Sequence, residues 1–590
     1  MLTRKLWSLL SVLMVLALLV SACAPAATPV PTQPPAPTKA PAPTQAPAPT
    51  QAPAPTQAPA ATEAPKATEA PKSNLLTKAA PDCSYGGTMK SIEAADASTV
   101  KFTLCNPDVA FLSKIAFGTL DIQSAAYLQK TGGGGTGSDL LTKPIGTGPY
   151  MVQEWVPGDH ITLVANPNYW GDAPKTKTVI FKWNKEAAAR LTSLKSGEAD
   201  AIDNADPNDF KSIGADPTLK LYPRPALNVM YLGMNNTKPP FDNEMVRQAI
   251  AQGIDRQVIV DKYYPAGSSV ADYFTPCAIP GGCEGDPWYK YDPVAAKALL
   301  AKAGFPNGFK TTLSYRDVVR GYLPAPSKVA VEIQSQLKKN LGIEVTIDVQ
   351  ESTTYLDNAA KGNLTLHMLG WGADYPDQTD FLDYHFGKGA SPQFGNKFDD
   401  LTALLAKAAA EADPAARLKL YAQANGLVKQ HVPMIPMVHG GSGVVYKATV
   451  AGALADPLSN EALNQMSIPG QDQLVFVQNG EPGSLYCADE TDGESLRVCN
   501  LVFNPLMGYK PGGTDVVPGL ATGCTPNTDL TVWTCTLRKA KFSDGTDVTA
   551  NDVVATYSAQ WDAADPLHVG RTGDFTYWSA FFNAFLNAKK

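Results

Sequence analysis

A loop with several functional side chains follows an apolar segment near residue 370. Leu364 to Leu369 has the character of a strand, and Gly370-Trp371-Gly372-Ala373-Asp374-Tyr375-Pro376-Asp377 follows it directly. A loop that holds an aromatic ring, an acid and glycines at a strand end is typical of a ligand contact. Trp371, Asp374 and Tyr375 are therefore candidate ligand-binding residues. In the alternative interpretation, Asp374 caps a following helix and Trp371 packs in the core.

A second candidate loop lies nearer the carboxyl end of the chain. Leu474 to Val477 is a short apolar run of the kind that a buried strand needs, and Asn479-Gly480 and Pro482-Gly483 are turn residues. Apolar side chains from Ser495 to Leu506 then follow the spacing of one helix face. A strand, a loop and a helix in this order hold ligands in open α/β sheets, so Glu481 and Ser484 are candidate contacts.

The sequence contains no clear pattern of catalytic residues. The six histidines are scattered, none belongs to a His-Glu-x-x-His pattern, and no Gly-x-Ser-x-Gly elbow is found. Asp374 and Asp377 are paired acids, but one sequence does not show their geometry. The glycine-rich stretch 131–139 lacks the lysine of a phosphate-binding loop. A binding protein is favoured over a hydrolase, and we expect no cofactor and no metal.

The amino end predicts export and a membrane anchor. Arg4 and Lys5 precede a short apolar stretch, and Val20-Ser21-Ala22-Cys23 follows it, as at a signal-peptide cleavage site. These four residues also resemble a bacterial lipobox, in which Cys23 carries the lipid; ordinary secretion is the alternative. Residues 23–79 are mostly Ala, Pro, Thr and Gln and lack the apolar side chains of a core, so we expect a disordered stalk.

The net charge and the cysteine content narrow the classes of protein to which this chain can belong. The net charge of −7 over 590 residues does not suggest a nucleic-acid surface. Eight cysteines remain besides Cys23, and an even number in an exported chain predicts disulfides. Cys277 with Cys283 and Cys524 with Cys535 are local pairs across turns. Elimination suggests Cys83 with Cys105 and Cys487 with Cys499, but the pairing of these four cysteines stays open.

Strands and helices alternate along most of residues 80–590. Asp292, Pro293 and Gly304 mark the cap, first position and end of one helix. Apolar strands are expected at Asn228 to Met234 and Val345 to Val349, among others. This alternation predicts an α/β fold with mixed or largely parallel sheets covered by helices.

Several segments resemble the family 5 extracellular solute-binding proteins of ABC importers, the oligopeptide and dipeptide binders. The most specific is "PIGTGPYMVQEWVPGDHITLVANPNYWG" (144–171), which contains the family's Pro-x-Gly-Thr-Gly-Pro turn and its Asn-Pro-x-Tyr-Trp end. "ARLTSLKSGEADAID", the Trp371 loop and "LRKAKFSDGTDVTANDVV" match further family segments. The resemblance implies a two-lobed, periplasmic-binding-protein-like fold of type II, in the three-domain variety.

The order of these segments differs from that of the family. The family's opening strand, loop and helix resemble residues 473–506, after the segment that resembles its carboxyl end. We therefore expect a circular permutation, with lobe I at about 140–262 and 441–510, a small domain II at about 511–590 and 80–139, and lobe III at about 263–440. The strand at Leu474 is expected in the same sheet system as the strand at Asn228. A truncated tandem duplication and two half-domains that complement another copy are the alternatives.

The resemblance implies a monomeric receptor, tethered outside the cell membrane, that closes around a peptide and delivers it to the ABC permease. Hinge crossings are expected at Ile254 to Tyr264 and Met437 to Val445. Asp374 would pair with the α-ammonium of the peptide, as the acid of the matching motif does in the family. Candidate contacts besides those above are Asn228, on the lobe of the Glu481 loop, and Tyr577 and Trp578. Arg316 or Arg320 is the candidate for a carboxylate, with a solvated surface charge as the alternative for either.

Other cargo is an open alternative within the same receptor role. Oligosaccharides, nickel chelates and other small solutes are also bound by this family. An aromatic cleft in which Asp374 has no ligand role would favour a sugar.

Overall fold

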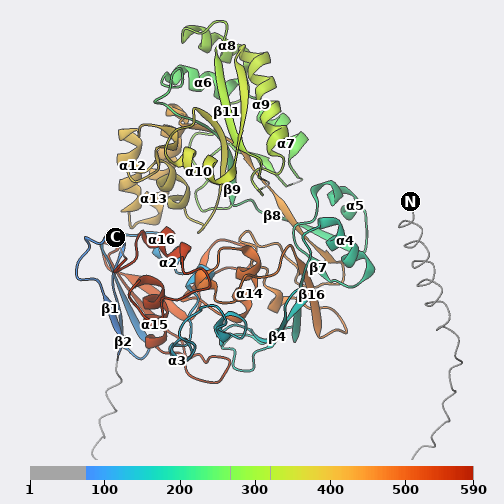
Figure 1. The fold of residues 1–590 in the computed structure, drawn as a ribbon, viewed down its shortest axis with the longest axis vertical. Helices are drawn as coiled ribbons and strands as arrows, with labels where there is room; N and C mark the ends of the chain where they lie inside the picture. The colour runs from blue at the N-terminus through green and yellow to red at the C-terminus, as the bar shows by residue number, and fades with distance from the viewer. Residues whose placement is uncertain (1–74, 266, 319, 589–590) are drawn as a thin grey trace, which may run out of the picture. The chain divides into compact units, whose positions relative to one another are not determined.

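The structure is a computed structural model that describes residues 75–588 except Ala266 and Val319. The predicted signal peptide, Cys23 and almost all of the predicted stalk lie outside the described residues. The described chain folds into three large sheets, a two-stranded hairpin and the helices that cover them (Figure 1). None of the helices among the described residues is long and apolar enough to span a membrane.

A seven-stranded sheet contains the strand that was predicted at Leu474. Its order is β4 (Tyr150–Val156), β5 (His160–Ala165), β6 (Thr178–Trp183), β16 (Gln473–Gln478), β7 (Ala201–Ile202), β15 (Ser442–Lys447) and β8 (Leu219–Arg224). β16 lies between β6 and β7 and is parallel to both. Leu474 and Phe476 enter one buried cluster and Val475 and Val477 another, so the strand is buried on both faces.

A five-stranded sheet joins the two ends of the described chain. Its order is β1 (Thr77–Ala79), β2 (Met89–Asp96), β3 (Thr99–Leu104), β20 (Val532–Leu537) and β19 (Ala521–Pro526). β3 pairs with β20 in an antiparallel register from Thr99 opposite Thr536 to Thr103 opposite Val532. We call residues 75–224 and 442–588, which hold these two sheets, the base lobe.

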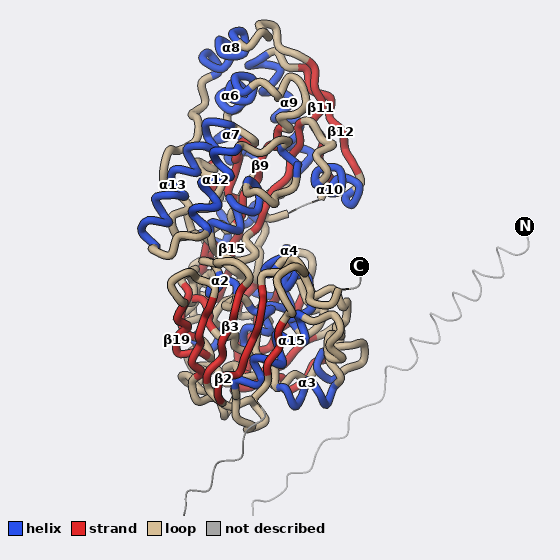
Figure 2. Tube along the Cα trace, turned by 90° about the vertical axis from the view of Figure 1, so that its left-hand side faces the viewer, coloured by secondary structure: helices blue, strands red, loops and turns tan. Residues whose placement is uncertain are grey.

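Helices and a short hairpin complete the base lobe. The hairpin consists of β17 (Met507–Tyr509) and β18 (Val516–Pro518). The helices are α2 (Phe111–Lys114), α3 (Ala125–Thr131), α4 (Ala187–Ser196), α5 (Phe210–Gly214), α14 (Gly493–Val502), α15 (Ala550–Trp561) and α16 (Thr576–Phe582). α15 lies beside β2 and β3 in the side view of the molecule (Figure 2).

Residues 228–439 form a second lobe, which we call the cap lobe. Its six-stranded sheet has the order β10 (Ser269–Val270), β14 (Met434–His439), β9 (Asn228–Met234), β13 (Leu366–Gly372), β11 (Lys310–Arg316) and β12 (Glu344–Gln350). Its α-helices are α6 (Glu244–Gly253), α7 (Arg256–Tyr263), α8 (Pro293–Lys302), α9 (Pro326–Leu341), α10 (Ser352–Ala360), α11 (Tyr384–Phe386), α12 (Asp399–Ala409) and α13 (Pro414–His431). The lobe has its own buried cluster, from Leu227 to Val438.

The structure confirms the predictions made for the start of one helix and for the disulfides. Asp292 caps α8 by accepting hydrogen bonds from the backbone of Val294 and Ala295, and Pro293 is the first residue of the helix. Both pairs that were predicted from local spacing are present. The four cysteines left open pair as elimination suggested. The disulfides of the described residues are Cys83–Cys105, Cys277–Cys283, Cys487–Cys499 and Cys524–Cys535.

The expected lobe boundary at residue 262 differs from the structure. β9 pairs with β13 on one side and β14 on the other, so residues 228–262 belong to the cap lobe. The expectation that the Leu474 and Asn228 strands share a sheet is therefore wrong. The chain crosses between the lobes at residues 225–227 and 440–441. The second crossing was expected. The first replaces the one expected at Ile254 to Tyr264, a segment that contains α7 and lies within the cap lobe.

Candidate functional site

A cavity of about 380 Å³ lies where the two lobes meet. The base lobe contributes polar and aromatic side chains, and the cap lobe contributes the end of β13 and the loop at Tyr322. Both crossing segments also line it. Side chains that face this cleft cavity include Phe117, Asn204, Arg224, Asn228, Tyr322, Asn500 and Tyr577. A ligand here would touch both lobes at once.

Glycines form much of the wall of the cleft cavity. Five of the lining residues are Gly118, Gly321, Gly372, Gly440 and Gly493. The Cβ positions of Gly372 and Gly493 point into open space, since no atom lies within 4 Å of either. Where a glycine lines a cavity, a ligand can approach the backbone closely. Main-chain N–H and C=O groups are therefore available as contacts.

A recess of about 430 Å³ in the cap lobe adjoins this cavity, because Tyr322 and Gly372 line both. Three of the predicted site residues gather here: Arg316, Trp371 and Asp374. The indole of Trp371 stacks on Tyr384, with ring centroids 4.2 Å apart and 27° between the planes. The Arg316 guanidinium donates to the Tyr322 hydroxyl at 3.4 Å. The recess therefore combines aromatic walls with charged groups of both signs.

Asp374 presents a carboxylate without a positive partner. Within the described part of the chain, no hydrogen bond or salt bridge to its side chain is present; its backbone N–H donates to Asp380 Oδ2 at 2.8 Å. Burial raises the pKa of Asp374 to about 6. Burial, and next the charge of Asp374, raise the pKa of Asp380 well above its ordinary value. Two desolvated acids side by side form a site that attracts a cation.

Tyr375, the third member of the predicted loop, connects the lobes and lines neither cavity. Its ring lies 5.3 Å from that of Phe581, edge to face, and Lys114 Nζ lies 5.4 Å from its centroid. It is 8% exposed and belongs to the buried cluster of the base lobe. Its hydroxyl lies 3.1 Å from Thr379 Oγ1. Tyr375 thus connects the cap lobe to the base lobe through ring packing.

Asn228 lines the cleft cavity, but it comes from the cap lobe and not from the lobe of the Glu481 loop. Its side-chain amide donates to the Gly440 carbonyl and accepts from the Gly440 N–H, both at 2.8 Å. The two crossing segments are therefore tied together at the start of β9. The amide is satisfied, so its role here is to fix the crossings.

Three other predicted contacts lie away from both cavities. Glu481 accepts hydrogen bonds from Trp155 Nε1 at 2.9 Å and from the Gly158 N–H, so it holds the turn between β4 and β5. Ser484 is buried and donates to Glu490 at 2.5 Å. Trp578 is fully buried and packs on Phe582. Tyr577, its neighbour on α16, does line the cleft cavity, 4.9 Å from the ring of Phe117.

A buried ionic cluster beneath the cleft cavity was not predicted. Arg224 bonds to Asp203 at 2.9 Å and to Glu461 at 2.5 Å. Arg497 bonds to the same two acids at 2.8 and 3.0 Å. All four side chains are at most 6% exposed, and coulombic attraction by the arginines holds the pKa of Asp203 at about 2 despite burial. The four residues come from distant parts of the chain, so no local pattern could reveal them.

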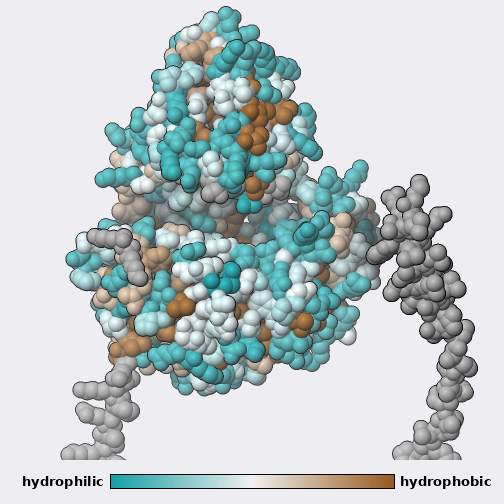
Figure 3. Space-filling model, in the orientation of Figure 1, coloured by the Kyte–Doolittle hydropathy of each residue, from teal (hydrophilic) through white to brown (hydrophobic). Residues whose placement is uncertain are grey.

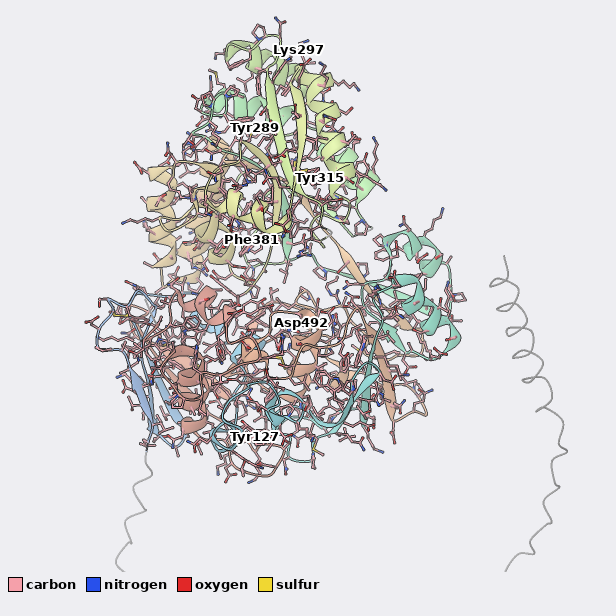
Figure 4. The ribbon with its side chains drawn as sticks, in the orientation of Figure 1. Tyr127, Tyr289, Lys297, Tyr315, Phe381 and Asp492 are labelled. Atoms are coloured by element: carbon pink, nitrogen blue, oxygen red, sulfur yellow. A yellow bond between two sulfur atoms is a disulfide. The ribbon has the colours of Figure 1, made fainter. Side chains whose placement is uncertain are left out.

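Neither Phe381, in the buried core of the cap lobe, nor Asp492, in the base lobe, lines the cleft cavity. Figure 4 labels Phe381 at the lower end of the cap lobe and Asp492 at the upper side of the base lobe. Asp492 caps α14 by accepting from the Ser495 N–H at 2.7 Å, and its neighbours Thr491 and Gly493 line the cavity. The face shown in Figure 3 is mostly hydrophilic on both lobes.

Among the described residues, no group of three or more metal-ligating side chains is found.

Comparisons with known proteins agree with this architecture. The family model "Bacterial extracellular solute-binding proteins, family 5 Middle" matches residues 60–393 and 515–574. Heme-binding protein A of Haemophilus influenzae is 30% identical over 388 residues, which cover 65% of this chain and 70% of that protein. The dipeptide-binding protein of Escherichia coli is 30% identical over 387 residues, covering 64% and 72%.

Solved structures give the same result. HbpA2 from Haemophilus parasuis matches with a TM-score of 0.61 and 32% identity, over 65% of this chain and 76% of that chain. The periplasmic binding protein DppA from Helicobacter pylori, solved with the peptide STSA, matches with a TM-score of 0.51 and 29% identity, over 65% and 74%.

Proposed function

This chain belongs to the bacterial extracellular solute-binding proteins of family 5, which are binding proteins and not enzymes, and we propose that it is the peptide receptor of an ABC importer. It captures peptides between the cap and base lobes and delivers them to the permease. Relatives named for dipeptide binding, and one solved with a bound peptide, support this cargo.

The observation that carries the proposal is the Asp374 carboxylate. It lines a recess beside the cleft cavity, burial raises its pKa to about 6, and a second buried acid, Asp380, lies next to it. The α-ammonium of a peptide would supply the missing positive charge. Such a charge-assisted contact is strong when both groups are shielded from water. The two acids would repel the propionates of a haem and gain nothing from a neutral sugar.

The remaining lining suits the rest of a peptide. The glycine-rich walls of the cleft cavity expose backbone groups that can bond to a peptide main chain, whatever its side chains are. Tyr577 and Phe117 offer aromatic surface from the base lobe. Arg316 lies in the same recess as Asp374 and is the candidate partner for a carboxylate. Main-chain recognition of this kind allows many peptide sequences to bind.

Delivery requires the cleft to open and close, and we propose that residues 225–227 and 440–441 are the hinge. Asn228 ties the two crossings together. Across the cleft, Tyr375 meets Phe581, and Thr514 Oγ1 donates to the Ala278 carbonyl at 2.8 Å. These contacts would form on closure, as in other two-lobed binding proteins. Small-angle scattering should show a smaller radius of gyration with peptide; an unchanged radius would contradict the hinge.

A lipid on Cys23 would place the receptor outside the cell membrane, next to its permease, as a monomer on a proline-rich stalk. The basic start, apolar stretch and small residues before Cys23 support this. A Cys23→Ser variant is expected to leave the membrane fraction of the expressing cell. Retention of that variant in membranes would reject the anchor.

A rotated segment order would account for the position of β16 between β6 and β7, which it follows by more than 270 residues in the chain. We propose that residues from about 471 to 590, followed by 80 to 468, correspond to the family order. The pairing of β3 with β20 supports a fold in which the two rotated parts of one chain pack against each other. The salt bridges of Arg497 to Asp203 and Glu461 support it as well.

Native mass spectrometry of the purified protein tests the function. The expected result is a set of added masses that correspond to short peptides carried through purification. A haem or a metal chelate as the only added mass, or a saccharide that tri-alanine displaces, would reject the proposal. Mild denaturation followed by sequencing of the released material separates the two outcomes.

A further inference from the structure

The base lobe holds a second cavity, of about 360 Å³, that the peptide proposal does not use. We call it the base-lobe chamber. Its lining comes only from the base lobe: Ala116, Pro149, the Tyr169-Trp170 pair, the 456–465 and 500–505 segments, and residues 508–519 at the β17–β18 hairpin. Asn460 and Asn500 line both this chamber and the cleft cavity, so they form a shared wall. The volume lies within the range of sites for small molecules.

Aromatic side chains with fixed orientations form part of the chamber. The Trp170 indole N–H donates to Asn504 Oδ1 at 2.8 Å. Tyr169 lies beside Trp170, with ring centroids 5.2 Å apart. The hydroxyl of Tyr509 donates to the Ser113 carbonyl, which holds that ring in place. Rigid rings of this kind give a ligand apolar contact at little cost in conformational entropy.

Amide side chains supply the polar part of the lining, and several of their groups are unused. Within the described residues, the side chains of Asn464 and Gln465 form no hydrogen bond. Asn500 donates to Asn460 Oδ1 at 2.6 Å, which leaves the amino group of Asn460 and the oxygen of Asn500 available. An amide offers two donors and one acceptor oxygen. It therefore suits a ligand whose groups both donate and accept.

No charge in the chamber is available for a ligand. No lysine, arginine or histidine is among its lining residues, and the two acids are already bonded. Glu461 is held by Arg224 and Arg497. Asp456 accepts from the Gly512 N–H at 2.8 Å and the Leu458 N–H at 2.9 Å. A zwitterionic peptide or an anion would leave its charges unpaired, which is costly. The occupant should therefore be neutral.

We propose that the base-lobe chamber is a binding site for a mono- or disaccharide, separate from the peptide cleft. Sugar hydroxyls donate and accept as the free amides require, and the C–H face of a sugar ring packs on aromatic rings. The inference does not depend on the cargo of the cleft. It requires only that both cavities can be filled at the same time.

Calorimetry with the full chain tests the site, with glucose, N-acetylglucosamine and their β-1,4-linked disaccharides as probes and tri-alanine as the cleft probe. At least one sugar should bind with equal affinity in the presence and absence of saturating tri-alanine. A double variant, Asn464→Ala with Gln465→Ala, should lose sugar affinity at least tenfold and keep tri-alanine affinity within twofold. These side chains have no partner, so folding should not change. Gln153→Ala, an exposed base-lobe amide without a partner, is the matched control.

Three outcomes would overturn the inference. The first is that none of the four sugars binds. The second is that tri-alanine displaces the sugar, which would place it in the cleft. The third is that the double variant loses tri-alanine and not sugar, which would make the chamber part of the peptide site. If tri-alanine does not bind but a sugar does, the peptide proposal fails and the saccharide site is still supported.

Discussion

At the scale of single residues, function rests on how burial changes the chemistry of one carboxyl group. Asp374 has no positive partner within the described residues, and burial raises its pKa from 3.8 to about 6. The protein thus keeps a carboxylate in an environment that disfavours its charge. A bound ammonium would reverse that effect and lower the pKa again.

Peptide affinity should therefore depend on pH around the pKa of Asp374. An ammonium binds the ionised carboxylate, so affinity should be high above pH 6 and fall as protons occupy Asp374 below it, by up to about tenfold per pH unit. Calorimetry with tri-alanine from pH 5 to 8 measures this. The Asp374→Asn variant is the control and should show a flat, weak profile. An unchanged wild-type affinity over this range would exclude Asp374 as the partner.

The ligand-free protein should show the opposite dependence. A carboxyl group whose pKa is raised on folding destabilises the folded state at pH values above that pKa. This penalty is present above about pH 6 and is relieved as the pH falls toward 3.8. Asp374→Asn should therefore raise the melting temperature of the ligand-free protein at pH 7.5, and the gain should shrink at pH 5. A lower melting temperature at pH 7.5 would mean that the carboxylate has a stabilising partner.

Sequence reasoning located some of these residues and missed others for identifiable reasons. The Trp371 loop was found because its residue types are unusual after an apolar strand, and Asp374 and Trp371 do line one recess. Glu481 has the same appearance in the sequence, but the turn at Gly158 takes its carboxylate. That hairpin lies more than 300 residues away, and no local pattern signals it.

At the scale of elements, the position of β16 decides how the base lobe holds together. Strands such as β16 and β9 could be predicted, since their apolar runs are short and bounded by turn residues or prolines. The sheet that each strand joins could not be predicted, because both strands are buried on two faces and are equally apolar. Asn228 was therefore assigned to the wrong lobe. The ionic cluster of Arg224, Asp203, Arg497 and Glu461 adds a polar connection between β16–α14 and the rest.

Replacing Arg497 tests that connection. Arg497→Met would leave Asp203 and Glu461 with one arginine between them in a buried site, and the free energy of unfolding should fall by about 3–5 kcal/mol. Lys541→Met is the control, because its salt bridge to Asp547 is exposed and worth less than about 1 kcal/mol. Chemical denaturation of the purified protein measures the free energy of unfolding of both variants. An Arg497→Met protein as stable as the control would mean that the ionic cluster does not stabilise the packing of β16 and α14 in the base lobe.

At the scale of the whole molecule, two lobes joined by two short crossings enclose a cavity with glycine-rich walls, and the cap-lobe recess that holds Asp374 adjoins it. The α/β class, the two local disulfides and the family were predictable, because they depend on local patterns and quoted motifs; the pairing of Cys83, Cys105, Cys487 and Cys499 was left open. The first crossing was not, since Pro225 to Leu227 is a short segment between two strands with no feature of a boundary. The base-lobe chamber was not predictable either, because its lining combines residues from six separate stretches between Ala116 and Gly519.

Calorimetry with two matched ligands tests the central claim most directly: tri-alanine with a free amino end and the same peptide with an acetylated amino end. At pH 7.5 the wild-type protein should bind the free peptide at least tenfold more tightly, a difference of about 1.4 kcal/mol or more. Asp374→Asn should remove most of that preference while the acetylated peptide binds as before. Equal affinity of the wild-type protein for both peptides would contradict the account.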